Sequence, residues 1–159
     1  MIHQEQLGQT IKNISKEIGF QQNAVFICVL NGAFMFFSDL IKNIDCVEAQ
    51  IDFIRVKSYV GIKQGKLKLT KDIEIDIKDK SVYLIDDIYD SGKTLKYLIK
   101  HLTKHKPKKI TPVALFKRVG SDHPDLIYGI ELPEGSFVYG FGLDDSNGFN
   151  RNLPFTLEE

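Results

Sequence analysis

Apolar side chains follow two spacings in the first third of the chain, and each spacing predicts a different element. Aliphatic residues recur at helical intervals just before Gly19, a residue type that commonly ends helices: Leu7, Ile11, Ile14 and Ile18. The continuous apolar run 24–30 is typical of a strand buried on both faces of a sheet. A Leu-Asn-Gly-Ala turn and an apolar helix over about 34–41 follow this run. The pattern therefore predicts a helix, a strand and a second helix, in this order.

The rest of the chain continues the alternation of strands and helices. Apolar patterns predict strands over 50–56, 81–85 and 110–116. In the first of these strands we expect four side chains to be inward or half-buried: Ile51, Phe53, Ile54 and Val56. A helix before the last strand is marked by apolar residues at i, i+3, i+4 and i+7: Leu95, Leu98, Ile99 and Leu102. Two further strands around a Pro-Glu-Gly turn are expected over 125–143.

The polar, lysine-rich stretch 57–72 interrupts this alternation, and we interpret it as a mobile excursion in the form of a two-stranded flap. Strands that alternate with helices predict an α/β fold with a central, mostly parallel sheet flanked by helices. Ligands of such sheets bind beyond the carboxyl ends of the strands. The turns expected to be functional therefore follow Leu30, Ile85, Phe116 and Phe141. No repeat or linker divides the sequence, so we expect one domain, 1–159.

Charge and composition narrow the function classes only slightly. The 21 basic and 21 acidic residues balance, which favours neither a nucleic-acid partner nor a membrane partner. The lysine-rich stretch 100–109 is interleaved with a helix end and is expected to be a solvated face. No apolar run is long enough to span a membrane. Cys28 is expected in the core, and two cysteines without a targeting segment favour the cytoplasm. The four histidines lack metal-ligand spacing supported by cysteine or carboxylate partners.

The candidate chemistry is concentrated in the segment 82–94, where an apolar strand runs into three carboxylates and a hydroxyl-rich turn. Exposed amides at the start of the following helix form an anion site, and Gly92 allows close approach of a ligand. Asp86 and Asp87 repel each other unless they accept hydrogen bonds from hydroxyl groups or face a divalent cation. A ligand with a phosphate and nearby vicinal hydroxyls, such as ribose 5-phosphate, satisfies both halves of the motif.

Three other interpretations explain this segment less well. A capped helix with solvated carboxylates explains a lone Asp-Ser-Gly turn, but it explains three carboxylates after a buried strand less well. A Walker A loop requires a glycine five residues before Gly92, where this chain has Asp87. A phosphoacceptor receiver domain would share acids at strand ends but not the hydroxyl-rich turn.

The segment IDDIYDSGKTL resembles the phosphoribosyl pyrophosphate motif of purine phosphoribosyltransferases. The resemblance extends over nearly the whole chain. VLNGAFMFFSDL is similar to the first loop and helix of that family, and KSYVG to the start of its mobile lid. VALFKR and FVYGFGLDDSNGFNRNLPF resemble the purine-reading strand and the C-terminal segment of the hypoxanthine-guanine branch. The resemblance implies a magnesium-dependent enzyme that joins a 6-oxopurine base to phosphoribosyl pyrophosphate.

The resemblance also implies roles for individual residues. Asp90 would act as general acid/base at N7 of the purine, although it could instead cap the helix. Binding of phosphoribosyl pyrophosphate would involve the 5-phosphate turn, the ribose acids, the first loop, the lid and one arginine: Asn31, Gly32, Ser58, Tyr59, Asp86, Asp87, Ser91, Gly92, Lys93, Thr94 and Arg151. The purine would be bound by Lys117, which donates to its 6-oxygen, by stacking on Phe137, and by backbone groups of Val138. Mg²⁺ would be held by Asp86, Asp87 and Asp144.

Two features depart from the family pattern. Many members carry lysine where this chain has Asn31, and the spacing after Asp144 is one residue longer than in many relatives, which affects the placement of Arg151. The resemblance also implies a non-proline cis peptide in the loop around Asn31. The resemblance further implies a homodimer or homotetramer, in which the cluster 34–37 is either a subunit contact or part of the core.

Several alternatives remain open at the level of function. A regulator that keeps the fold as a phosphoribosyl pyrophosphate sensor and binds nucleic acid is the main alternative. Lys117, Phe137 and Asp144 favour the enzyme. Adenine- or orotate-specific relatives fit less well than the 6-oxopurine branch, and the choice among hypoxanthine, guanine and xanthine is left open.

Overall fold

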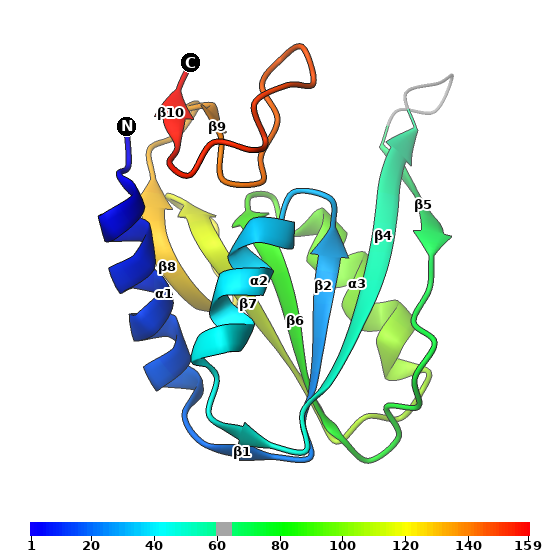
Figure 1. Cartoon of the computed structure of the whole chain (residues 1–159). Coiled ribbons are helices and arrows are strands. Elements are labelled where there is room, and N and C mark those ends of the chain that lie inside the picture. The colour runs from blue at the N-terminus through cyan, green and yellow to red at the C-terminus, as the bar shows by residue number, and fades with distance from the viewer. Residues whose placement is uncertain (60–64) are drawn as a thin grey trace.

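The computed structural model describes residues 1–59 and 65–159, and its centre is a mostly parallel sheet with helices on both faces (Figure 1). The three helices of these described parts are α1 (Gln4–Ile18), α2 (Phe34–Asn43) and α3 (Lys93–Thr103). The strands of the main sheet, in chain order, are β2 (Val25–Leu30), β4 (Gln50–Tyr59), β5 (Lys66–Lys71), β6 (Ser81–Tyr89), β7 (Lys109–Arg118) and β8 (Ile127–Leu132). Four two-residue strands form two small pairs: β1 (Gln21–Gln22) with β3 (Cys46–Val47), and β9 (Val138–Tyr139) with β10 (Leu157–Glu158).

The order of the main sheet is β5-β4-β2-β6-β7-β8, and within the described part of this sheet only the β4–β5 pair is antiparallel. The predicted α/β fold is therefore confirmed. The strand predicted over 24–30 is β2, and it pairs with β6. The described part of the lysine-rich stretch forms a two-stranded flap with the end of β4, as predicted. Residues 60–64, which the sequence also assigned to the predicted flap, lie outside the described part of the chain.

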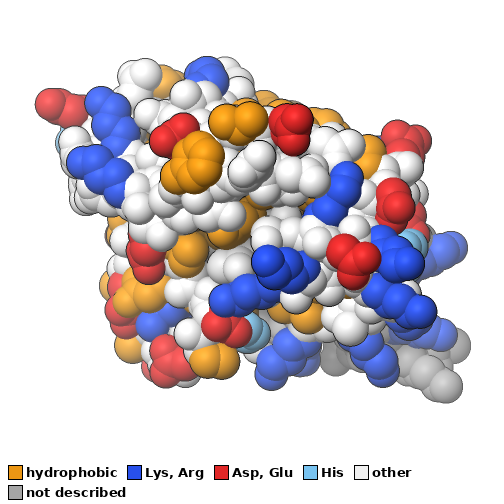
Figure 2. All heavy atoms as spheres, turned by 90° about the horizontal axis from the view of Figure 1, so that it is seen from below, with side chains coloured by type: hydrophobic (Ala, Val, Ile, Leu, Met, Phe, Trp, Pro, Cys, Tyr) orange, Lys and Arg blue, Asp and Glu red, His pale blue; other side chains and the backbone are white. Residues whose placement is uncertain are grey.

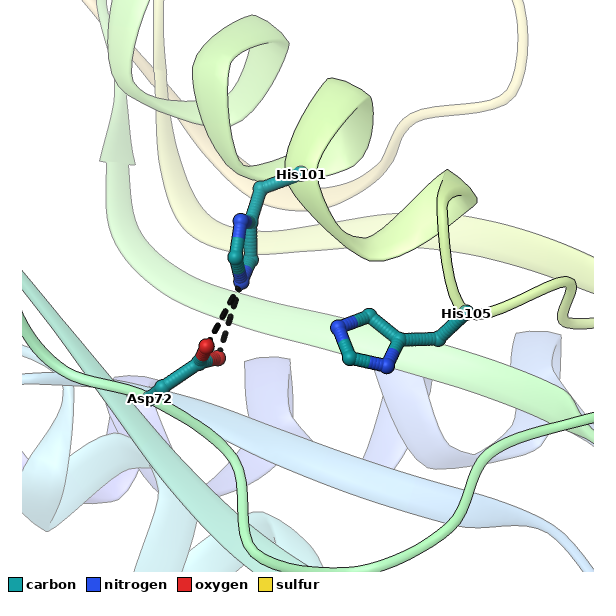
Figure 3. Close-up of side chains that lie close together, drawn as sticks. All are labelled: Asp72, His101 and His105. Carbon is teal, nitrogen blue, oxygen red and sulfur yellow. Dashed lines mark hydrogen bonds and ion pairs between the residues drawn. The ribbon is translucent and has the colours of Figure 1, made fainter.

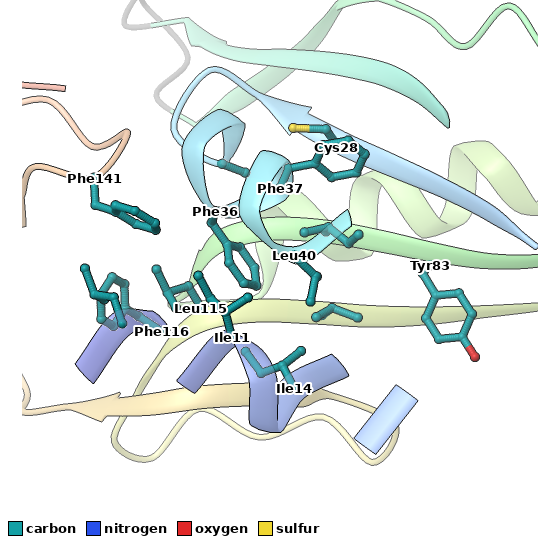
Figure 4. Packing of buried hydrophobic residues seen from close by; sticks show 14 of the residues in the cluster. Ile11, Ile14, Cys28, Phe36, Phe37, Leu40, Tyr83, Leu115, Phe116 and Phe141 are labelled. Carbon is teal, nitrogen blue, oxygen red and sulfur yellow. The ribbon is translucent and has the colours of Figure 1, made fainter. Parts of the chain in front are cut away.

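Successive side chains of each strand point to opposite faces, and helices cover both. Helices α1 and α2 pack on one face around Ile11, Phe36 and Leu115 (Figure 4), and α3 packs on the other around Leu84 and Leu98. All four periodic residues predicted in the first helix are buried, as are three of the four in the helix after β6. The periodicity thus predicted the face of each helix that meets the sheet.

The inward-facing positions of β4 were predicted in part wrongly. Ile54 is buried and Val56 is half-buried, but Ile51 and Phe53 are 43% and 37% exposed. The face of β4 that carries Ile54 also carries Asp52, which is buried because it accepts backbone amides from the segment that follows β5. Because alternate side chains of a strand point to opposite faces, Ile51 and Phe53 point to the face at the edge of helix α2, and this helix covers them incompletely.

One strand boundary and one strand pairing also differ from the sequence prediction. Strand β6 does not end at Ile85 but continues through the carboxylates to Tyr89, where it pairs with Lys117 of β7. The two strands around the Pro-Glu-Gly turn exist, but β8 pairs with β7 and β9 pairs with β10. The C-terminal segment is therefore a separate layer above the sheet rather than a continuation of it (Figure 1).

Candidate active site

The carboxyl ends of β2, β6 and β7 lie side by side, and the segment after β8 lies over them (Figure 1). Parallel strands place their carboxyl ends at one edge of a sheet, so turns distant in the sequence meet there. Phe141 anchors the C-terminal segment, because its ring is buried in the cluster formed with α1 and α2 (Figure 4). The predicted site residues on these turns are brought together at this edge.

An acid pair occupies the end of β6. Asp86 is buried, and its carboxylate accepts the backbone amide of Asp87 at 2.9 Å. Burial, followed by the adjacent negative charge of Asp87, raises the pKa of Asp86 well above its ordinary value. Burial also raises the pKa of Asp87, against the opposing effects of a hydrogen bond with Asp86, the backbone amide of Ile88 and the positive charge of Arg151. The fold thus holds two carboxyl groups with little compensation for their charge.

The first loop lies directly against this pair. The Leu30–Asn31 peptide bond is cis, as expected from the resemblance. A Cβ atom at Gly32 would overlap the carboxylate of Asp87, and one at Gly142 would overlap the carbonyl oxygen of Gly32. The first loop is therefore in contact with both the acid pair and the C-terminal segment, at distances that require glycine.

The turn after β6 forms a small cavity of about 60 Å³ at the start of α3. Its lining includes Asp86, the turn 90–92 and the first residues of the helix, Lys93 and Thr94. Gly92 precedes α3 with a φ of 75°, and a Cβ there would lie 2.6 Å from the hydroxyl oxygen of Tyr89. The N-cap is Gly92, so Asp90 is not the helix cap of the alternative interpretation, and the hydroxyl of Ser91 accepts the amide of Lys93 at 3.4 Å. The open amides and the helix dipole make the cavity suitable for a phosphate group.

The C-terminal segment places a positive charge beside the acid pair. Arg151 donates to the carbonyl oxygen of Gly142 at 2.7 Å and forms an ion pair with Asp144 at 2.7 Å. Asp145 shapes the intervening loop, because its carboxylate accepts the amides of Asn147 and Phe149 at 2.9 Å each. The amide of Phe149 is the largest of the effects that lower the pKa of Asp145. The loop between Asp144 and Arg151 is thus closed by Asp145, and it brings Arg151 back to Asp144 and Gly142.

A second, open cleft of about 590 Å³ lies on the other side of Asp90. Phe137, 44% exposed, and Arg118 line it together with the turns 119–121 and 134–136. Arg118 lies 3.6 Å from the carboxylate of Asp90 and donates to the carbonyl oxygen of Ser136 at 2.5 Å. The cleft therefore offers an aromatic face, a carboxylate and a guanidinium group, which suit a flat, polar heterocycle.

Comparisons with known proteins agree with this geometry. The model of the phosphoribosyl transferase domain matches residues 1–146. The chain belongs to the phosphoribosyltransferase family. A hypoxanthine-guanine phosphoribosyltransferase of Bacillus subtilis is 34% identical over 98% of this chain and 89% of its own length, and one of Staphylococcus aureus strain Mu50 is 36% identical over 92% and 87%. The solved structure of a hypoxanthine-guanine phosphoribosyltransferase from Bacillus anthracis matches with a TM-score of 0.88 and 36% identity over 100% of this chain and 96% of that one.

Most residues of this phosphoribosyltransferase that were predicted to bind ligands lie at the carboxyl edge of the sheet. Lys117 does not line the open cleft. Its ammonium group lies 3.1 Å from Asp122, 3.9 Å from Glu131 and 4.7 Å from the centre of the Tyr128 ring. The hydrogen bond that the ammonium group of Lys117 donates to the carboxylate of Asp122 raises the pKa of Lys117. The neighbouring Arg118 lines the cleft instead.

Other predicted residues lie as follows. Val138 is buried next to Phe137, so only its backbone can take part in binding. Ser58 is exposed near the tip of the flap, opposite Leu67, and Tyr59 is the last described residue before the gap in the flap. Asn31 is exposed in the first loop. Among the described residues, no helix is both long and apolar enough to cross a membrane.

Arg118 is the residue of this phosphoribosyltransferase site that the sequence interpretation missed. The motif VALFKR contains it, but the alternation of a strand points Lys117 and Arg118 to opposite faces and does not say which face meets the cleft. The hydrogen bonds of Arg118 to the turn 133–136 hold its side chain in the cleft, and they exist only in the folded chain.

Proposed function

We propose that this phosphoribosyltransferase transfers the 5-phosphoribosyl group of phosphoribosyl pyrophosphate to hypoxanthine or guanine, giving IMP or GMP and pyrophosphate. The observation that carries the proposal is that the end of β6 joins the acid pair, Asp86 and Asp87, to an anion cavity lined by Asp86 and Asp90, and that Asp90 also lines the cleft that contains Phe137. The names of the similar enzymes support the choice of bases. We further propose that residues 1–159 form one domain, that two or four copies assemble, and that the enzyme works in the cytoplasm.

Two groups of residues are proposed to hold phosphoribosyl pyrophosphate. The amides and hydroxyl groups of the turn 91–94 would bind the 5-phosphate at the start of α3, and the carboxylates of Asp86 and Asp87 would accept hydrogen bonds from the ribose hydroxyls. Backbone groups of Asn31 and Gly32, with Arg151, would bind the pyrophosphate. Ser58 and Tyr59 on the flap would close over the ligand and exclude water.

The acid pair also fits a divalent cation. Two adjacent carboxylates that burial and mutual repulsion make costly to ionise are oxygen ligands of the kind that Mg²⁺ prefers. Asp144, held by Arg151, would contribute a further oxygen. When bound, magnesium supplies positive charge that offsets the negative charge developing on the departing pyrophosphate.

The base is proposed to lie in the open cleft against Phe137, with the backbone of Val138 at its edge. Lys117 would donate to the 6-oxygen, which requires its ammonium group to leave Asp122, a carboxylate whose side chain is 85% exposed. An ion pair with so exposed a partner is weak, so exchange for a ligand oxygen costs little. Arg118 already lies in the cleft and can donate to the same group without such a change.

In the reaction the protein itself forms no covalent bond with the substrates. Departure of pyrophosphate leaves positive charge on C1 of the ribose, N9 of the base attacks this carbon, and the carboxylate of Asp90 accepts the proton that leaves N7. Arg118 lies 3.6 Å from Asp90 and fixes the carboxylate beside the cleft. Alignment of base and ribose between the two cavities supplies most of the expected rate.

The test is nucleotide formation from phosphoribosyl pyrophosphate with hypoxanthine, guanine, xanthine and adenine in parallel, with and without Mg²⁺. We expect magnesium-dependent product from hypoxanthine or guanine and none from adenine. Asp90→Asn, which keeps the size of the side chain, should lower kcat by about 10²-fold or more. Asp125→Asn, an exposed acid outside both cavities, is the control. Tight binding of phosphoribosyl pyrophosphate without turnover of any base would favour the nucleic-acid-binding sensor instead.

A further inference from the structure

A cluster of two histidines and one aspartate lies outside the site described above. Asp72 follows β5, His101 is in the last turns of α3, and His105 is four residues further along the chain. The candidate ligand atoms of the three side chains all lie within 4.8 Å of one another. Figure 3 shows the three side chains converging from two separate segments, with the ring of His105 facing the Asp72–His101 pair. The folded chain thus corrects the expectation that the histidines lack a carboxylate partner.

We propose that Asp72, His101 and His105 bind a late first-row divalent cation, with zinc as the best match to the ligands. Imidazole nitrogen and carboxylate oxygen are common zinc ligands, and three of them with one water complete a tetrahedral site. Mg²⁺ binds oxygen ligands and does not compete well for two imidazoles. The proposed site is therefore chemically distinct from the acid pair Asp86–Asp87.

The geometry is close to that of a metal site without being one already. Ligand atoms at about 2.0–2.1 Å from a tetrahedral zinc ion are about 3.4 Å apart. His101 Nε2 lies 2.9 Å from both carboxylate oxygens of Asp72, and the rings of His101 and His105 are 5.6 Å apart. His105 is exposed, so rotation of its side chain brings the third ligand into range.

The neighbouring backbone holds the carboxylate ligand in place. Asp72 Oδ1 also accepts the backbone amide of Ile73 at 2.8 Å. The buried Asp52 accepts the amides of Glu74 and Ile75 at 2.7 and 3.1 Å, which fixes the segment just after Asp72. Such supporting contacts orient metal ligands and strengthen binding. An ion bound here would link the segment just after β5, which carries Asp72, to the C-terminal end of α3, near His101 and His105.

Metal binding to the purified protein, in excess Mg²⁺ to occupy the acid pair, tests the proposal. Co²⁺ should bind with one equivalent and with absorption bands typical of tetrahedral coordination, and Zn²⁺ should displace it. His105→Ala should weaken Zn²⁺ binding by at least about tenfold, because it removes one ligand and leaves the Asp72–His101 pair intact. His3→Ala and Cys46→Ser, which alter residues outside the cluster, should leave the affinity unchanged.

Thermal unfolding provides a second measurement. Zn²⁺ at about 100 times its dissociation constant should raise the Tm of the unmodified protein by about 5 °C or more, and the rise should be lost in His105→Ala. Absence of saturable binding, equal affinity in His105→Ala, or loss of binding in Cys46→Ser would each overturn the assignment. None of these measurements depends on transferase activity, so they are independent of the proposed function.

Discussion

At the scale of single residues, the site contains carboxyl groups whose ionisation lowers the stability of the folded chain. Asp86 is buried beside Asp87, and burial and repulsion both oppose its ionisation. A carboxyl group whose pKa is raised in the folded state binds more protons there than in the unfolded chain. Its contribution to the free energy of unfolding therefore falls as the pH rises from the ordinary value of about 4 through the raised value.

The variant Asp86→Asn tests whether the charge of Asp86 lowers the free energy of unfolding. The amide oxygen can still accept the backbone amide of Asp87, but the negative charge is gone. We expect the free energy of unfolding at pH 7.5 without Mg²⁺ to rise by about 1–2 kcal/mol and the gain to shrink toward about pH 4. Nucleotide formation should fall by about 10–100-fold, because a charge-assisted hydrogen bond to the ligand is lost. Asp39→Asn on the surface should change neither quantity. Equal stability of Asp86→Asn and the unmodified protein at both pH values would contradict the account.

The residue scale also marks how far the sequence could predict the site. The carboxylates at the end of β6 and the glycine turn were found because their chemistry is unusual for a strand end. The side chains that meet the cleft were harder to predict. Lys117 and Arg118 are adjacent, and the turn 133–136 selects Arg118 for the cleft through bonds across 15 and 18 residues. No local pattern contains that information.

At the scale of elements, one buried carboxylate connects the flap to the body of the sheet. Asp52 of β4 accepts three backbone amides, from Phe53, Glu74 and Ile75. Burial opposes ionisation, but these amides and the nearby ammonium group of Lys71 outweigh it and lower the pKa of Asp52. A lowered pKa adds stability above the ordinary value of about 4, and this stability is lost as the pH falls through the folded value.

We expect Asp52→Asn to lower the free energy of unfolding by about 1.5–3 kcal/mol at pH 7, since three amides lose a charged acceptor. The difference from the unmodified protein should become smaller below about pH 4, where the unfolded chain is protonated at this position. Denaturant unfolding at several pH values measures it. Asp76→Asn is the matched control, because Asp76 is exposed and accepts one amide within its own turn. A difference that did not vary with pH would exclude the role of charge.

At the scale of the whole molecule, the site exists only where three distant segments meet. Gly32 of the first loop is in contact with Asp87 at the end of β6 and with Gly142 of the C-terminal segment. The C-terminal segment is held there by the burial of Phe141 and by paired backbone hydrogen bonds between Ile2 and Thr156, at 2.9 and 3.0 Å. Packing of both ends of the chain therefore positions Asp144 and Arg151.

Gly142→Ala and Gly148→Ala separate this contact from ordinary backbone strain. Both glycines have positive φ values, 101° and 84°, but a Cβ at Gly142 would overlap the carbonyl oxygen of Gly32, whereas nothing lies within 4 Å of a Cβ at Gly148. We expect Gly148→Ala to cost about 1 kcal/mol with little loss of activity. Gly142→Ala should cost about 2 kcal/mol or more and lower kcat/KM by at least about tenfold, because the first loop must move. Chemical unfolding and the nucleotide assay measure both, and equal effects of the two variants would contradict the contact.

The sequence by itself determined the order of the elements, the buried faces of the helices, the parallel sheet and the motif 86–94, because each depends on periodicity or on residue chemistry within one short segment. The tertiary structure decided which face of β4 is buried, that Arg118 rather than Lys117 lines the cleft, and that Asp72 lies beside His101. Each of these depends on a contact between segments far apart in the chain. The physical reason is that hydrophobic periodicity acts over a few residues, whereas hydrogen bonds and packing across the sheet select among faces that are locally equivalent.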